Sequence, residues 1–347
     1  MAIVLGTNRY GKAEVRLVHV DRTTPVHVIT DLNVTSQLIG DFADTHLTGA
    51  NDKVIATDTQ KNTIYALARR DGIGAIEEFG LRLARNYVGT YAYVTGARME
   101  IEQYAWDRIQ TADGPHDHSF TRGPATVRTT VVKKGTGASA ATGDVGRASA
   151  ATGDVGRASA ATGDVGRASA ATGDVGRASV ATPGLNGDET VISGVSGLIV
   201  LKSTGSEFHG FPDVPYTSLV ETDDRVMATS VTSRWVYNTL EVDFDSVFAS
   251  VKAILLEQFA VVHSLSLQQT LFAMGRSVLE AHPQISEIRL SMPNLHHFVV
   301  DLGKWDLDNP NMVFYAADRP YGLIEAAVVR DDAPVPPGTW DGVAGFV

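Results

Sequence analysis

The chain has 347 residues, of which 44% are hydrophobic and 20% are charged, with 29 basic side chains, 40 acidic ones and no cysteine. This composition can bury a large core, which rules out a wholly disordered chain, and the length suggests two or three domains. The absence of cysteine excludes disulfides, iron–sulfur clusters, thiolate zinc sites and cysteine nucleophiles. A formal charge of −11 argues against a nucleic-acid partner. No apolar run is long enough for a membrane span or a secretory signal, so we expect a cytoplasmic protein.

The first part of the chain predicts two strands followed by two helices. Alternating polar and apolar residues indicate strands at 12–17 and 26–29. One helix begins at Thr57 with a capping-box pattern that ends at Gln60, and the next has apolar residues at helical spacing. Strand-like segments follow at 91–94 and 99–101. The core residues expected from the helices are Ile64, Leu67, Ala68, Ile76, Phe79, Leu83 and Tyr87.

A ten-residue repeat occupies the middle of the chain. The sequence ASAATGDVGR at 138–147 recurs three times, up to residue 177, and a decayed copy follows. One sizeable apolar residue per unit cannot bury a core. Strand-like residues lie on both sides, at 127–132 and 190–192, so we expect an insertion at the tip of a β-hairpin. Lengthening such a loop from about 5 to about 50 residues costs only about 2 kcal/mol. We interpret 135–188 as a flexible surface loop, with a partner-binding or solenoid segment as the alternative.

The second part repeats the order of the first. Strands are expected around 190–204 and 231–244, then a helix opened by Asp245, a second helix, and strands at 286–302 and 312–328. Two tandem units, at 1–134 and 189–347, predict an α+β fold in which paired helices cover one face of an antiparallel sheet. The core residues expected from the two helices are Val247, Val251, Ile254, Phe259, Val262, Leu271, Met274, Val278 and Ala281.

Common cofactor motifs are absent from the sequence. Gly72-Ile73-Gly74 lacks the third glycine of a dinucleotide fingerprint, and Leu201 stands where a phosphate loop has glycine before its lysine. Neither HExxH nor GxSxG occurs. His116 and His118 flank an aspartate, but without a third ligand nearby a polar loop is the better interpretation.

Three places combine side chains that suit chemistry, although each also has a structural explanation. Thr57 and Asp58 lie at an expected helix N-terminus, where backbone N–H groups favour anions, but Thr57 can also be a simple cap. Asn294 and His296 share one strand face about 7 Å apart, with Pro293 interrupting regular pairing; a strand histidine is more often structural. Phe208 and Arg225 flank a segment rich in Gly, Pro and Asp and suit a flat, anionic, heteroaromatic ligand.

Six segments around these places resemble the urate oxidase (uricase) family, in its bacterial form, and the resemblance covers the whole chain apart from the residues near 135–188. The matching segments are 10–16 (YGKAEVR), 31–34 (DLNV), 56–63 (ATDTQKNT), 201–208 (LKSTGSEF), 294–298 (NLHHF) and 318–322 (DRPYG). The resemblance implies two tandem tunnelling-fold (T-fold) units per subunit, a dimer that closes a β-barrel, and a homotetramer. It also implies oxidation of urate by O₂ and water to 5-hydroxyisourate and hydrogen peroxide, with no metal or organic cofactor.

The resemblance further implies a role for each matched residue. Lys12, Thr57 and His296 would form a proton relay. Asn294 and Thr57 would hold O₂ or the attacking water, and Asp58 would orient the purine. The remaining expected substrate contacts are stacking by Phe208, an ion pair from Arg225, the side-chain amide of Gln268 and the backbone N–H of Leu267. In the family, Thr57 and Asp58 come from the neighbouring subunit, so the sites would lie between subunits.

Two other functions remain open from the sequence. The chain could be another purine or pterin enzyme of the same fold, although the zinc ligands typical of those enzymes are not found. It could also be a non-catalytic purine-binding protein that displays the repeat to a partner, although all matched functional positions are intact.

Overall fold

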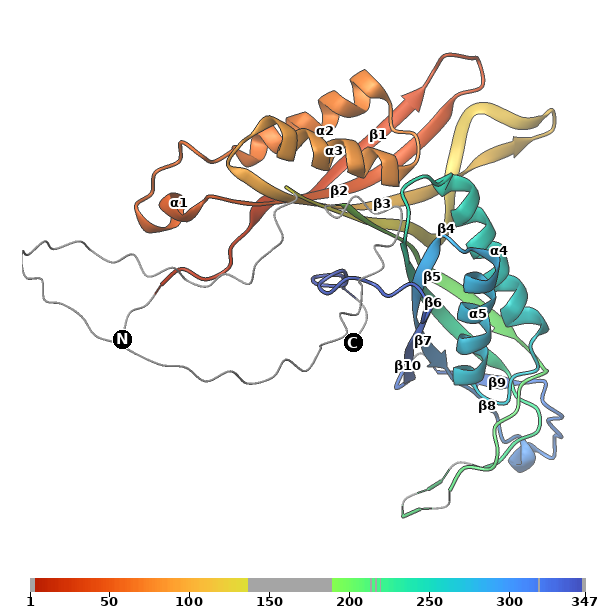
Figure 1. Ribbon diagram of the computed structural model, residues 1–347. Helices are drawn as coiled ribbons and strands as arrows, with labels where there is room; N and C mark the ends of the chain where they lie inside the picture. Colours follow the sequence, from red (N-terminus) through yellow and green to blue (C-terminus); the bar gives the residue numbers. More distant parts are fainter. Residues whose placement is uncertain are drawn as a thin grey trace, which may run out of the picture.

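A single antiparallel sheet of eight strands forms the centre of the computed structural model (Figure 1). The structure describes residues 4–136, 189–212, 214–215, 217–218, 220–317 and 319–344. The strand order is β1-β2-β3-β4-β5-β6-β7-β10, so β1 and β10 are the two edges. The strands are β1 (Tyr10–Asp21), β2 (Val28–Gly40), β3 (Val94–Thr111), β4 (Gly114–Gly135), β5 (Glu189–Lys202), β6 (Met227–Tyr237), β7 (Ile285–Leu295) and β10 (Gly322–Val329).

Two pairs of helices cover one face of this sheet (Figure 1). The first pair is α2 (Thr57–Asp71) and α3 (Ile76–Thr90), and the second is α4 (Phe244–Val261) and α5 (Leu267–Ala281). The order strand–strand–helix–helix–strand–strand therefore occurs twice, which confirms the predicted α+β fold with its tandem units. Smaller elements are α1 (Ala43–Leu47), β8 (His297–Val299), the 3₁₀ turn Gly303–Trp305 and β9 (Phe314–Ala316).

The core lies between the helices and the sheet. Each helix contributes apolar residues at three- and four-residue intervals, as the sequence predicts, and most of the expected core positions are buried. Three expectations are wrong or partly wrong. Ala281 is exposed at the end of α5, Val262 lies beyond α4 as its C-terminal cap, and Ile254 is only half-buried.

The other face of the sheet is partly covered by the C-terminal segment 333–344. Successive strand residues point to opposite faces, so Val132 packs under the helices whereas Val131 packs against Val343. The Lys133 ammonium donates to the carbonyls of Gly338, Thr339 and Asp341 at 2.8–3.0 Å. These bonds hold the segment on the face opposite the helices.

Strands β4 and β5 pair directly on either side of the repeat. Lys134 lies opposite Glu189 in the antiparallel register, and their side chains form an ion pair of 3.1 Å. The hairpin expected around the insertion is therefore present, while the repeat itself lies outside the described residues.

Two helix starts differ from the sequence-based expectation. Ala56 is the N-cap of α2 and no side chain caps it, so Thr57 is not the cap that its pattern suggested. The capping box fails because the Gln60 amide is buried and bonds to Ser36 and Ile55 instead. Helix α4 is capped by Asp243, which accepts from the Ser246 N–H, and not opened by Asp245.

The strands of the second unit are also interrupted more than expected. The segment 286–302 divides into β7 and β8, and 312–328 divides into β9 and β10. At Pro293 the pairing with β6 is broken between Asn294 and Ser291, although β10 pairs with β7 throughout. Proline lacks the N–H that regular pairing needs.

Candidate active site

Phe208 and Arg225 lie together in the second unit, as the sequence suggested. Phe208 and Thr222 exchange two backbone hydrogen bonds of 2.8 and 3.1 Å, which bring the two segments side by side. The Arg225 N–H donates to the Ser206 carbonyl at 2.8 Å, and its Nε donates to the Ser206 hydroxyl at 3.2 Å. The guanidinium carbon then lies 5.1 Å from the centroid of the Phe208 ring. The aromatic ring and the fork of N–H donors therefore lie next to each other, and the ring also stacks on that of Phe211 at 5.3 Å between centroids.

The charge of Arg225 is not compensated within the part of the chain that the structure describes. Its guanidinium makes no ion pair with any of these residues, and burial lowers its pKa from the usual value. A half-buried cation without a carboxylate partner favours an anionic ligand, because the charge of the ligand compensates for the hydration that the guanidinium loses on burial.

The N-terminus of α5 is attached to the segment that carries Ser206 and Phe208. Ser206 and Ser264 pair as a short parallel bridge, with the Glu207 N–H donating to the Ser264 carbonyl at 2.9 Å. Ser266 then caps α5 by accepting from the Gln269 N–H. Leu267 is the first residue of the helix and is buried, while the adjacent Gln268 is exposed. Backbone N–H groups of a first turn have no partner within their helix, so the Leu267 N–H is available to a ligand.

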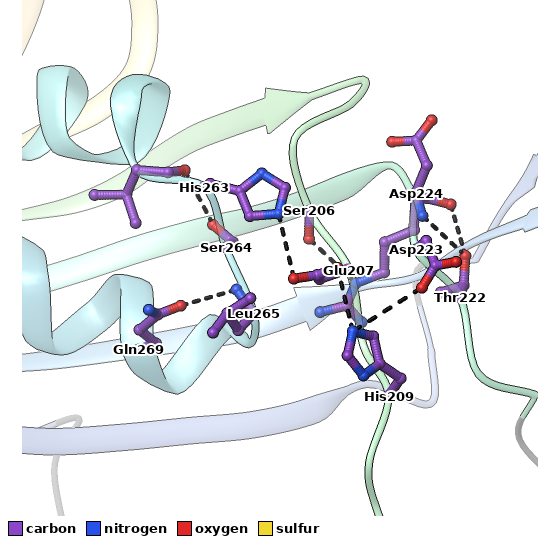
Figure 2. A network of polar contacts seen from close by, with 12 residues as sticks. Ser206, Glu207, His209, Thr222, Asp223, Asp224, His263, Ser264, Leu265 and Gln269 are labelled. Carbon is purple, nitrogen blue, oxygen red and sulfur yellow. Dashed lines mark hydrogen bonds and ion pairs between the residues drawn. The ribbon is translucent and has the colours of Figure 1, made fainter.

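Lys202 holds the loop before α5 in position, a role that sequence reasoning did not assign. Its ammonium donates to the Val262 carbonyl and the Ser264 hydroxyl, both at 2.6 Å, and the same hydroxyl lies 2.6 Å from that of Thr270. Figure 2 shows this loop beside the segment of Ser206 and Glu207. Lys202 and Ser206 belong to the LKSTGSEF segment, which the sequence analysis singled out. No role was assigned to these two side chains from that segment.

His296 and Asn294 lie at the end of β7. Asn294 is opposite Thr229 of β6 and Gly322 of β10. His296 follows the last strand residue, and its ring stacks on that of Phe298 at 5.6 Å. Burial, followed by the positive charges of Arg225 and His297, lowers the pKa of His296. His296 therefore lies within range of the charge of Arg225.

Lys12 belongs to a second group, in the first unit. It is half-buried on β1, and its N–H donates to the Ser36 hydroxyl at 3.4 Å. A Cβ atom on the preceding Gly11 would lie 1.8 Å from the Ser36 carbonyl oxygen, so only glycine permits β1 to approach β2 there. The chain then bulges between Lys12 and Val15.

Thr57 and Asp58 lie near Lys12. The Tyr10 hydroxyl accepts from the Ile55 N–H at 2.8 Å, which ties the start of β1 to the segment before α2. Thr57 is exposed, and its hydroxyl makes no hydrogen bond with a described residue. A hydrogen bond and the charge of Lys61 lower the pKa of Asp58, and the charge of Lys12 adds to this effect. Within one chain the charge of Lys12 therefore acts on Asp58.

The two groups are far apart within one chain. Lys12 is on the edge strand β1, whereas Asn294 is on β7, and five strands separate them. At roughly 4.8 Å per strand, the path across the sheet is about 29 Å. One subunit thus contains both halves of the predicted site but does not bring them together.

The His116–His118 segment contains no metal site by the geometry of the described residues. The rings of these two histidines meet edge to face at 4.5 Å. The group of three metal-binding side chains found among the described residues includes neither of them. None of the described helices is long and apolar enough to cross a membrane.

The eight-stranded antiparallel sheet with two pairs of helices is that of the tunnelling-fold class, and its candidate site combines the Phe208 ring with the Arg225 guanidinium. A model of the Uricase family matches residues 8–133 and 191–325, on either side of the repeat. The chain is 48% identical to the uricase of Arthrobacter globiformis, covering 99% of this chain and 96% of the relative. It is 34% identical to the uricase of Dictyostelium discoideum, covering 93% and 96%. The chain therefore belongs to the uricase family.

Solved structures agree with this assignment. The crystal structure of the Arthrobacter globiformis uricase superposes with a TM-score of 0.80 at 48% identity, covering 98% of this chain and 99% of the other. A uricase from Bacillus fastidious has a TM-score of 0.68 at 20% identity, covering 94% and 95%, and supports the fold alone.

Proposed function

We propose that this member of the uricase family oxidises urate with O₂ and water to 5-hydroxyisourate and hydrogen peroxide, without a metal or organic cofactor. The observation that carries the proposal is the Arg225 guanidinium over the Phe208 ring, half-buried and without an ion-pair partner among the described residues. Urate is a flat anion, and this arrangement offers it one stacking surface and one charged fork. The two electrons leave the purine and reduce O₂, while water supplies the added oxygen atom.

The second unit holds the substrate in this proposal. Phe208 stacks on the purine, and Arg225 binds its anionic edge through two N–H groups. The Gln268 amide and the Leu267 N–H bind the opposite edge, since both lie in the first turn of α5. A charged hydrogen bond of the Arg225 type contributes about 1.5–3 kcal/mol. Two clamped edges fix the plane of the ring and the face that O₂ approaches.

The first unit supplies the proton transfers. Lys12 activates the Thr57 hydroxyl, and His296 completes the relay from the second unit. Removing a second proton from urate raises its ability to give an electron to O₂, so a relay that accepts protons near the ring accelerates the reaction. Thr57 and Asn294 hold O₂ or water above the ring, and Asp58 orients the purine from beside Thr57. The lowered pKa of His296 keeps the imidazole neutral, as a proton acceptor requires.

The proposal needs two subunits for each site. Because the sheet has eight antiparallel strands, its edges β1 and β10 run in opposite directions. A partner's β1 placed beside β10 would continue the antiparallel pairing, and the same contact at the other edge would close a barrel. This pairing would bring the Lys12 group of one subunit towards β7 and His296 of the other. We propose this dimer, doubled into a homotetramer, as the active form.

The remaining parts of the proposal concern the chain's organisation. We propose that 1–134 and 189–347 are the two T-fold units and that 135–188 is an insertion outside the catalytic machinery. The family match on either side of the repeat supports this division. We expect the reaction in the cytoplasm, which cell fractionation would test.

The first experiment measures the reaction itself. Purified protein is treated with a chelator and incubated with urate in air, and loss of urate absorbance and formation of peroxide are followed together. We expect both, in equal amounts. If no urate is lost, the result would favour a non-catalytic binding protein. If urate is lost only after metal is added, the result would indicate a metal-dependent enzyme.

A second experiment tests the shared site. Lys12→Met and Arg225→Gln should each have little activity alone at urate concentrations below KM, while co-expression of both chains should restore about a quarter of wild-type activity. Half of randomly formed dimers are mixed, and each of these has one site with both wild-type halves. If mixing restores nothing, the two residues act within one subunit and the proposed interface is wrong.

A further inference from the structure

Four polar side chains, Glu207, His209, Asp223 and His263, gather in the region that Figure 2 shows. The two oxygens of Glu207 face two histidines: Oε2 lies 3.2 Å from His209 Nε2, and Oε1 lies 3.3 Å from His263 Nε2. On its other side, His209 Nε2 lies 3.9 Å from Asp223 Oδ1. Glu207 and His209 flank Phe208 in the sequence, and Asp223 is two residues from Arg225.

The spacing of three of these ligand atoms matches that of a metal site. Zinc binds nitrogen and oxygen at about 2.0–2.2 Å in tetrahedral geometry, so its ligand atoms lie roughly 3.3–3.5 Å apart. The pairs around His209 measure 3.2 and 3.9 Å, and the ligand atoms of Glu207, His209 and Asp223 all lie within 4.8 Å of one another. Small movements of the exposed His209 and Asp223 side chains towards Glu207 would give the tetrahedral distances.

The donor types narrow the choice of ion. One imidazole nitrogen and two carboxylate oxygens suit Zn²⁺ and similar transition metals, whereas Mg²⁺ and Ca²⁺ prefer oxygen ligands throughout. His263 contacts the second oxygen of Glu207, the position from which an outer partner orients a ligating carboxylate. Asp223 is 96% exposed in its side chain and Glu207 only 17%, so an ion can enter from solvent towards a more covered ligand.

We propose that Glu207, His209 and Asp223 form a binding site for a zinc-class transition metal, with His263 as the outer partner of Glu207. The ion takes no part in the oxidation. It connects the segment that carries Phe208 to the segment that carries Arg225, and it neutralises two carboxylates next to the site of an anionic substrate.

The effect on the enzyme rests on the proposed function. Removing the repulsion between these carboxylates and urate should lower KM by about threefold, or about 0.7 kcal/mol, the size of an exposed charge interaction. The value of kcat should stay unchanged, because none of the three ligands contacts the reacting atoms in the proposal.

The binding test uses the whole protein without urate. Metal-free protein is titrated calorimetrically with ZnCl₂ in a non-chelating buffer, and the same titration is repeated with MgCl₂. We expect one saturable zinc site per chain and no magnesium binding at the same concentrations. His209→Ala and Asp223→Asn should each weaken zinc binding at least tenfold, and His263→Ala should weaken it less. Replacement with Co²⁺ should give the visible absorption of a tetrahedral complex.

His116→Ala is the control, because this histidine is half-buried on β4, lies beside another imidazole, His118, and is far along the sequence from Glu207. Zinc binding that survives His209→Ala but is lost in His116→Ala would overturn the proposal, as would the absence of any saturable binding. Since these titrations contain no substrate, their outcome is separate from that of the urate assay.

Discussion

The Arg225 guanidinium carbon lies 5.1 Å from the centroid of the Phe208 ring, and the two residues are held there by backbone bonds through Thr222 and Ser206. These bonds tie the backbone that carries the stacking surface to the backbone that carries the charge.

Arg225→Gln should weaken the binding of a non-oxidisable purine anion by roughly 10- to 100-fold, because the variant loses a charge-assisted pair of hydrogen bonds. Calorimetry or fluorescence titration measures the dissociation constant. Arg276→Gln is the control, since Arg276 is exposed and pairs with Glu280. Equal affinity of wild type and Arg225→Gln for the analogue would refute the clamp.

Lys12→Met should reduce turnover by at least about 100-fold, the usual contribution of an acid–base group, while the affinity for the same analogue stays unchanged. Methionine keeps most of the side-chain volume on β1 and removes the ammonium. Steady-state kinetics and analogue titration measure the two quantities. Lys53→Met, at an exposed lysine that pairs with Asp41, should have wild-type turnover. Unchanged turnover in Lys12→Met would exclude it from the relay.

Arg128→Met should lower the free energy of unfolding by about 3–5 kcal/mol, because it leaves a buried carboxylate unpaired. Glu77 is fully buried, accepts from Arg128 Nη2 at 2.7 Å, and accepts from the Ser193 hydroxyl. Arg128 also pairs with Asp245, so it joins the two units. Denaturant unfolding measures the change at constant protein concentration. The double variant with Glu77→Gln should be more stable than Arg128→Met alone; an equal loss would show that the buried charge is not the cause.

Acidification should destabilise the protein through His282. Burial lowers the pKa of this histidine, whose Nε2 lies 2.9 Å from the Ser250 hydroxyl. Between the unfolded pKa of about 6.5 and the lower folded value, the unfolded chain binds the proton and the folded chain does not. Stability therefore falls as the pH decreases through this range. Thermal unfolding at several pH values measures the slope, which should be flatter in His282→Gln; the same slope in both would assign the effect to other groups.

Deletion of 138–177 should leave kcat, KM and the oligomer size unchanged within about twofold. The flanking pair Lys134–Glu189 already closes the strands, and shortening the connection should add about 1 kcal/mol of stability through a smaller closure entropy. Activity assays and sedimentation measure the outcome. Loss of activity on deletion would show that the segment takes part in function or assembly.

Local patterns were sufficient for much of the fold. Ile76, Phe79, Leu83 and Tyr87 repeat at helical spacing because they form one face of α3, and all four are buried as expected. The helix starts were less predictable. Thr57 and Gln60 have the spacing of a capping box. The Gln60 side chain instead accepts a hydrogen bond from the Ser36 hydroxyl, which belongs to a strand distant in sequence, and no local pattern predicts that contact.

The substrate side of the site was also accessible from the sequence, because Phe208 and Arg225 are close along the chain and chemically distinctive. Lys202 was not, since its partners Val262 and Ser264 are about sixty residues away. The cluster of Glu207, His209 and Asp223 was missed for a similar reason: its spacing matches no short metal motif, and only the pairing of Phe208 with Thr222 brings its members together.

The sequence by itself determined the class of elements, their tandem order, the place of the repeat and the residues that resemble the family's site, because periodicity and motifs are properties of neighbouring residues. Only the tertiary structure decided that Lys12 lies with Asp58 at one edge of the sheet, five strands from Asn294. Strand order is set by long-range pairing, which leaves no trace in local spacing. The separation of these residues within one chain is the physical reason for expecting the partner subunit in the site.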